Sequence, residues 1–180
     1  MFFKSAIFVF LVALVSIVSA EEKMVCHESP SYLIVEGQTG EVGTHFLVKY
    51  KSKKNQSSAC EYSVKPGDFE IRNELAEYFL GLQGDLLILD SGTGPDPRGL
   101  FIWDLKKKKK VYSGRYSEAK IEPGYIKFWI ETGVATDENC PDAKEWSAGG
   151  LGAAIETRVR LDFADFSATK SSEKRCSPRQ

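Results

Sequence analysis

A two-residue alternation of apolar and polar side chains constrains the fold of this chain more than any other feature. It is clearest over residues 155–163, where every second position holds an apolar residue or a threonine: Ile155, Thr157, Val159, Leu161 and Phe163. Four charged residues occupy the positions between them: Glu156, Arg158, Arg160 and Asp162. Side chains of a β-strand point alternately to opposite faces of a sheet, so this pattern predicts a strand with one buried face and one face in water.

Further segments predict antiparallel strands joined by tight turns. Residues 45–51 alternate in the same way, and residues 78–82, 86–89, 100–105, 111–116 and 126–130 are rich in aromatic and aliphatic side chains. Gly84 and Pro123-Gly124 lie at the expected hairpin turns. A short helix is expected at residues 141–146, capped by Asn139, and residues 73–79 fit either a helix or a strand. The sequence therefore predicts an all-β or β-rich fold, an antiparallel sandwich or barrel with one or two short helices.

The first twenty residues have the three zones of a cleavable export signal. Lys4 lies in the short N-terminal zone, residues 5–18 form an uncharged apolar zone, and Val18-Ser19-Ala20 offers small residues for cleavage after Ala20. The apolar zone is shorter than the ~20 residues of a membrane-spanning helix. We therefore expect a secreted or periplasmic protein without stable membrane insertion after cleavage, and an uncleaved membrane anchor is the alternative.

The charge and length of the remaining chain limit its partners and its domain organisation. Residues 1–20 contain Lys4 and no acid, so residues 21–180 have 23 basic and 25 acidic residues. This near-balance argues against nucleic acid as the main partner. The length suits a single secreted β-rich domain. Residues 167–180 are expected to form a polar C-terminal tail held by one cysteine.

All four cysteines lie beyond the predicted signal, at Cys26, Cys60, Cys140 and Cys176. An exported chain reaches an oxidising compartment, so two disulfides are expected. The spacing does not determine the pairing. We favour Cys26–Cys60 and Cys140–Cys176, because each bridge then ties a terminus to its neighbouring segment. Zinc sites use cysteines two to four residues apart, and the wide spacing here does not fit one.

Asp90 is the one catalytic candidate that the sequence offers. The segment Leu87-Ile88-Leu89-Asp90-Ser91-Gly92-Thr93 resembles the active-site turn of aspartic proteases, in which two aspartates share a proton. The resemblance covers seven residues and implies a catalytic role for Asp90. A second Asp-Thr-Gly or Asp-Ser-Gly is absent, so such an enzyme would have to be a homodimer. The alternative is a polar loop that closes two strands, with glycine and proline supplying the backbone angles.

Two loops offer binding candidates instead. Asp90, Asp96 and Arg98 lie in the first loop, whose oxygen atoms also suit calcium, although the order of the acids is not that of an EF-hand. Lys106, Lys108 and Lys110 belong to a run of five lysines, which predicts a solvated hairpin tip or a surface that attracts anions. A solvated loop is the simpler interpretation of each, and we expect neither a metal nor a cofactor.

The functional hypotheses follow from these weak signals. The two histidines, His27 and His45, lie in no motif with a serine nucleophile. Ser113-Gly114-Arg115-Tyr116 resembles, with altered spacing, the Ser-Gly-x-x-Tyr loop of small exported lysozyme inhibitors. We therefore expect a non-catalytic binding or inhibitor-like module whose partner is an extracytoplasmic protein or glycan. The alternatives are an acid hydrolase that uses Asp90 and an envelope-associated structural protein.

Overall fold

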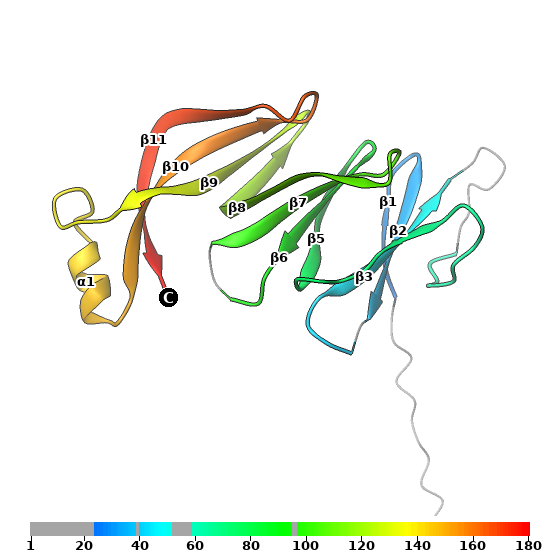
Figure 1. The fold of residues 1–180 in the computed structure, drawn as a ribbon, viewed down its shortest axis with the longest axis horizontal. Helices are drawn as coiled ribbons and strands as arrows, with labels where there is room; N and C mark the ends of the chain where they lie inside the picture. Colours follow the sequence, from blue (N-terminus) through cyan, green and yellow to red (C-terminus); the bar gives the residue numbers. More distant parts are fainter. Residues whose placement is uncertain (1–23, 39, 52–58, 95–96) are drawn as a thin grey trace, which may run out of the picture.

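The computed structural model describes residues 24–38, 40–51, 59–94 and 97–180. The predicted export signal and its cleavage site after Ala20 lie outside the described residues, as does Asp96. The described chain is built almost wholly of antiparallel strands arranged in two sheets, with one short helix (Figure 1). The expected β-rich, sandwich-like fold is confirmed.

Both sheets follow the order of the chain, so each strand pairs with its sequence neighbour. The four-stranded sheet contains β1 (Val25–Glu28), β2 (Tyr32–Gln38), β3 (Thr44–Tyr50) and β4 (Phe69–Ile71). The seven-stranded sheet begins with β5 (Glu77–Gln83), β6 (Leu86–Ser91), β7 (Arg98–Asp104) and β8 (Lys109–Glu122). It continues with β9 (Tyr125–Val134), β10 (Gly152–Asp162) and β11 (Ala168–Arg179), and α1 (Ala143–Ala148) lies between β9 and β10.

The hairpin of β6 and β7 lies between two hydrophobic cores. On one face, Leu87, Leu89 and Phe101 pack with buried residues of β2, β3 and β4. On the other face, Ile88 and Leu100 pack with buried residues of β8, β9 and β10. Strands that are buried on both faces carry continuous apolar runs rather than an alternation. This explains why residues 86–89 and 100–103 lack the two-residue pattern seen elsewhere.

A change of partner along β8 lets the second half of the long sheet reach the far face of this hairpin. β8 pairs with β7 as far as Tyr116 and with β9 from Ser117 onward. The register shifts between Ser117 and Lys120, and Glu118 has a positive φ of 45° at this point. Such an irregularity bends a strand and increases its twist. Figure 1 shows the result: β9–β11 and β1–β3 lie on opposite sides of β5–β7.

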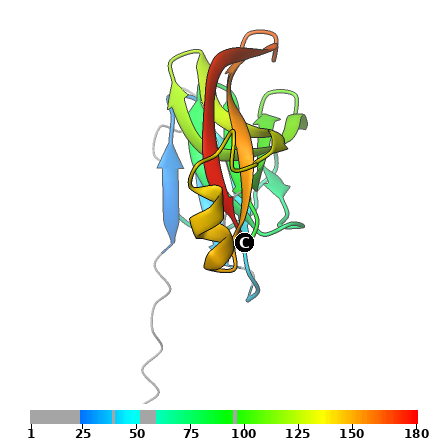
Figure 2. The ribbon, with the colours of Figure 1, turned by 90° about the vertical axis from the view of Figure 1, so that its left-hand side faces the viewer.

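The helix forms near its expected position with a different start. It spans Ala143–Ala148, Asp142 occupies the cap position, and no side chain caps it. The expectation that Asn139 caps the helix is wrong, because its side chain stabilises the preceding turn: Oδ1 accepts the amide hydrogen of Thr136 at 2.7 Å. The helix lies beside β10 and β11 (Figure 2). Residues 73–76 form a turn, and residues 77–79 begin β5.

The C-terminal segment is a strand rather than a tail. Residues 168–179 form β11, which pairs with β10 over most of its length. Backbone hydrogen bonds of an edge strand form whatever the polarity of the side chains, and for this reason the polar composition of residues 167–180 is misleading. Cys176 does hold this strand, but it is not the only contact.

Buried Glu156 corrects the prediction that it lies on the wet face of its strand. Its side chain is fully buried, although the sequence pattern groups Glu156 with the charged residues that lie between the apolar positions. The pairing of β10 with β9 continues without a shift from Glu156 to Arg160, so Glu156 shares the face of Arg158 and Arg160. It is buried there because side chains of β11 lie over it.

Two arginines of β11 neutralise the Glu156 carboxylate. Arg175 Nε lies 2.7 Å from Oε2, and Arg179 Nη2 lies 2.6 Å from Oε1. Burial alone would raise the pKa of Glu156, but the nearby Ser117 hydroxyl and the two arginines outweigh it and hold the pKa below its ordinary value. The carboxylate is therefore ionised in the folded protein and ties β11 to β10.

Both disulfides have the favoured pairing, Cys26–Cys60 and Cys140–Cys176, and no described cysteine is free. The first ties β1 to the segment that follows β3, and the second ties the turn before α1 to β11. Two disulfides indicate an oxidising, extracytoplasmic environment. Among the described residues, no helix combines the length and apolar character needed to span a membrane.

We expect Leu100→Ala to lower the free energy of unfolding by about 2–5 kcal/mol, because its side chain is fully buried in the core that β7 shares with β8, β9 and β10. Chemical denaturation followed by tryptophan fluorescence measures this. Val134→Ala is the control, since Val134 is 79% exposed, and its effect should stay within about 0.5 kcal/mol. Equal effects of the two substitutions would contradict the two-core arrangement.

We expect Glu156→Gln to lower the free energy of unfolding at pH 7 by about 3 kcal/mol, because it leaves two arginines beside an uncharged group. The pKa of Glu156 is lowered on folding, so its stabilisation is complete above the ordinary glutamate value of about 4.3 and is lost as pH falls through the lower folded-state pKa. The gap between variant and wild type should therefore close in acid. Glu131→Gln, at the exposed partner of Arg179, is the control and should cost less than about 1 kcal/mol. A gap that stays constant in acid would exclude the carboxylate as its cause.

Candidate functional site

A row of positive side chains crosses the face of β8, β9 and β10 that is turned away from the core. In the strand pairing, Lys120 of β8 lies opposite Lys127 of β9, and Lys127 lies opposite Arg160 of β10. Residues directly opposite on neighbouring strands share a face of the sheet. We call Lys120, Lys127 and Arg160 the cation row. Thr169 of β11 continues it, because it lies opposite Arg160.

The cation row places like charges opposite one another, and the nearby carboxylates of Glu122 and Asp162 offset part of the repulsion. Like charges directly opposite on neighbouring strands destabilise a sheet, typically by about 0.2–1 kcal/mol for each pair. Lys120 is partly compensated by Glu122, whose hydrogen bond raises the pKa of the lysine. Asp162 lies 3.4 Å from Arg160. Lys127 forms no ion pair within the described part of the chain. A charge arrangement that costs stability is a candidate for a binding role.

Arginine side chains of this face lie over aromatic rings of β9. The guanidinium of Arg160 lies 3.7 Å from the centre of the Tyr125 ring, and that of Arg158 lies 5.3 Å from the Trp129 ring. Arg175 lies over the same tryptophan at 4.5 Å. A guanidinium over an aromatic face is attracted to the ring and keeps its N–H groups available at its edge. Tyr125 and Trp129 therefore position arginines and are themselves largely covered.

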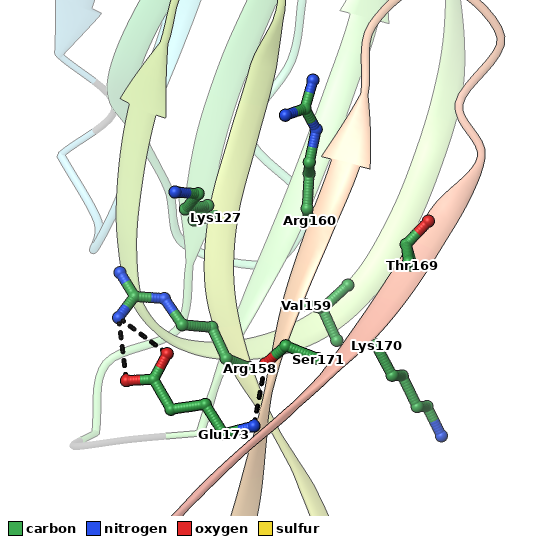
Figure 3. Close-up of a pocket in the computed structure, with 8 residues that line it drawn as sticks. All are labelled: Lys127, Arg158, Val159, Arg160, Thr169, Lys170, Ser171 and Glu173. Carbon is green, nitrogen blue, oxygen red and sulfur yellow. Dashed lines mark hydrogen bonds and ion pairs between the residues drawn. The ribbon is translucent and has the colours of Figure 1, made fainter.

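A groove of about 450 Å³ runs beside the cation row and is shown in Figure 3. Four cations line it: Lys127, Arg158, Arg160 and Lys170. Thr169 and Ser171 add hydroxyl groups. Glu173 is the one carboxylate in the lining, and both its oxygens lie 3.4–3.5 Å from Arg158 Nη1. Lys170 lies opposite the buried Val159 in the strand pairing, and its side chain points away from the other three cations in Figure 3. Lys127, Arg158, Arg160 and the single carboxylate therefore give the groove an excess of two positive charges in a protein whose formal net charge is −1.

Asp90 forms a structural ion pair at the end of β6. Arg98 Nε donates to Oδ1 at 2.7 Å and to Oδ2 at 2.8 Å, and Arg98 Nη2 also contacts Oδ2. The Tyr116 hydroxyl donates to Oδ1 at 2.8 Å. Arg98 Nη1 donates to the carbonyl of Gly94, so the pair closes the loop between β6 and β7. This arrangement favours the loop-closing interpretation of Asp90. Asp96 lies outside the described residues, so its predicted role is not described.

Lys106, Lys107 and Lys108 lie in the expected turn between β7 and β8, Lys109 and Lys110 begin β8, and several of the five are held by contacts rather than only by water. Lys107 pairs with Asp104 at 2.9 Å. Lys108 donates to the Gly67 carbonyl at 3.2 Å and lies 5.2 Å from the Phe69 ring, whereas Lys110 lies 4.1 Å from the Phe101 ring. The three predicted binding lysines therefore do not share one surface.

Lys106 and Lys108 line a second cavity of about 460 Å³ between the ends of the two sheets. Tyr32, Tyr50 and Phe69 supply its aromatic walls. Burial, and then the nearby Asp85 carboxylate, raise the pKa of Tyr32. The cavity suits a small apolar molecule, and Lys108 is already engaged by the Gly67 carbonyl.

Other candidates from the sequence are dispersed. Residues 113–116 lie within β8 rather than in a loop, so the resemblance to the loop of lysozyme inhibitors does not extend to the structure. Among the described residues, no group of three or more histidine, cysteine, aspartate or glutamate side chains gathers as metal ligands do. The sequence does not predict the cation row, because only the strand pairing brings its members together. The alternation around Arg158 and Arg160 was the one available signal.

The comparisons with known proteins give no further guidance: no family model, no curated protein and no solved structure matches this chain.

We expect Asp90→Asn to lower the free energy of unfolding by about 1.5–3 kcal/mol, because the charged hydrogen bonds with Arg98 are weakened. Denaturation at neutral pH measures this. A peptidase assay in acid, performed on wild type and variant, separates the structural role from the alternative of an acid hydrolase. Acid peptidase activity that disappears in a fully stable Asp90→Asn protein would contradict the structural interpretation.

Proposed function

We propose that this protein is an exported, non-catalytic binding module that recognises an anionic extracytoplasmic partner across the cation row. The export zones of residues 1–20, with cleavage after Ala20, support a secreted or periplasmic location. The two disulfides agree with it. Residues 21–180 then form the mature protein.

The cation row is the observation that carries this proposal. Its three members lie on three neighbouring strands, and two of them, Lys127 and Arg160, also line a groove together with Arg158. A folded chain gains nothing from placing like charges opposite one another. An anionic partner removes this repulsion when it binds, so the arrangement favours association with negative charge.

The two alternatives have weaker support. An acid hydrolase would require the Asp90 carboxylate for proton transfer, and that group is engaged by Arg98 and Tyr116. A structural protein of the envelope requires no ligand-binding site, so this alternative does not explain the cation row. A binding module accounts for both the stable scaffold and the charged face.

The test compares two triple variants that remove the same charge. The row variant combines Lys120→Gln, Lys127→Gln and Arg160→Gln. The control variant combines Lys109→Gln, Lys144→Gln and Lys174→Gln, at exposed lysines that form no ion pair within the described residues. Binding of residues 21–180 to immobilised dextran sulfate and poly-L-glutamate is measured at several salt concentrations.

We expect wild type to bind at least one polyanion, with an affinity that falls as salt rises. The row variant should bind at least about tenfold more weakly, since it loses three charge-assisted contacts, and the control variant should stay close to wild type. Equal losses in the two variants would mean that only the overall charge matters. Absence of binding by wild type would reject the proposal.

A second prediction separates binding from stability. We expect Lys127→Gln to raise the free energy of unfolding by about 0.2–1 kcal/mol at low salt, because it removes the repulsion from Lys120 and Arg160. The same substitution should weaken binding to the polyanion. Thermal and chemical denaturation provide the first measurement. A destabilised Lys127→Gln protein would show that the lysine serves the fold.

A further inference from the structure

We infer that the partner of the cation row is a linear acidic polysaccharide, whose carboxylate or sulfate groups meet the row as the polymer lies across the strands. This inference rests on the proposed function and specifies the class of its ligand. It depends on the direction of the row, on the polarity of the surface, and on the state of the aromatic rings.

The direction of the row suits an extended chain with regularly spaced charges. Lys120, Lys127 and Arg160 lie on successive strands, so the row runs perpendicular to them with a step of about 4.8 Å. Thr169 adds a hydroxyl at the next step. A linear polysaccharide with acidic sugars repeats its charges at steps of similar size. The polymer crosses the strands, and each strand contributes one contact.

The polarity of the surface argues against an acidic protein or a membrane as the partner. Protein interfaces have an apolar centre from which charged residues are depleted. Among the described residues that line this groove, Val159 is the one apolar side chain, and it is 3% exposed. The large exposed apolar side chains lie elsewhere: Val25, Val42, Tyr50, Val64, Leu75 and Val134. A membrane surface likewise requires apolar side chains that insert between lipids.

The aromatic rings argue against single-stranded nucleic acid. Proteins that bind it stack bases on open aromatic faces. Here the guanidinium of Arg160 covers Tyr125, and Arg158 and Arg175 lie over Trp129, which is 7% exposed. The rings serve to orient the arginines and leave little face on which a base could stack.

The chemistry of the groove matches acidic sugars. A guanidinium presents a planar fork that matches the two oxygens of a carboxylate or sulfate, and Arg160 is held over Tyr125 with this fork at the surface. Lys127 adds a point charge. The hydroxyls of Thr169 and Ser171 are suited to the neutral hydroxyls of the same polymer.

The test measures binding of residues 21–180 to four polymers in solution: heparin, polygalacturonate, neutral dextran and poly-L-glutamate. Heparin presents sulfate and polygalacturonate presents only carboxylate, so their comparison identifies the acidic group. Poly-L-glutamate presents the same carboxylates on a peptide. We expect at least one acidic polysaccharide to bind about tenfold or more tightly than poly-L-glutamate, and dextran to show no binding.

Two further variants make the test specific to the site. Arg160→Lys keeps the charge and removes the fork, and we expect it to weaken binding of the acidic polysaccharide several-fold. The row variant should abolish most of the binding, and the matched control variant should retain it. Circular dichroism and thermal unfolding establish that each variant is folded.

Each result separates this inference from the proposal on which it rests. If poly-L-glutamate binds as tightly as the polysaccharides and the row variant loses both, the ligand class is wrong and the anion-binding function stands. If no polyanion binds, or if the row and control variants bind alike, both are rejected. Preference for an acidic polysaccharide that is lost in the row variant supports both.

Discussion

Burial of the β6–β7 hairpin on both faces is the constraint on which the rest of this structure depends. Its alternate residues enter two different cores, one shared with β2, β3 and β4 and the other with β8, β9 and β10. Neither core is completed by the hairpin alone, so the four-stranded sheet and the second half of the long sheet must both pack against it. The hydrophobic free energy of two cores is thereby gained around one short element. The disulfides and the ion pairs act at the periphery of this arrangement.

The position of the candidate site follows from how the long sheet reaches the second core. β8 changes partner near Ser117, and the strands beyond it turn one face to Ile88 and Leu100 and the other to solvent. That solvent face carries the cation row. Its far edge is β11, which the buried Glu156 holds through Arg175 and Arg179 and which Cys140–Cys176 links to the turn before α1. The strand at the edge of the charged surface is thus firmly attached, so the proposed binding would require little ordering of this edge.

The two charged arrangements in β10 differ in what they do for the protein. Glu156 is buried and satisfied by two arginines, and its loss would leave charges without a partner. Arg160 is half exposed and faces Lys127, so its neutralisation relieves repulsion. Residues of the first kind stabilise the fold, whereas residues of the second kind are the ones on which the proposed binding function rests. Asp90, the most suggestive residue in the sequence, belongs to the first kind.

Much of the fold could be predicted from the sequence, because the features involved are local. The strand at residues 155–162 and the hairpin turns at Gly84 and Gly124 agree with the structure. The favoured pairing of the four cysteines also agrees, although their spacing did not determine it. The helix start, the strand at the C-terminus and the burial of Glu156 could not be predicted, because contacts with distant segments override local patterns. The candidate site belongs to this second group. Alternation by itself determined that Arg158 and Arg160 share a face, since side chains of a strand repeat every two residues. Only the register between strands decided that Lys120, Lys127 and Arg160 form one row, and register is set by the cores and bends of the whole sheet.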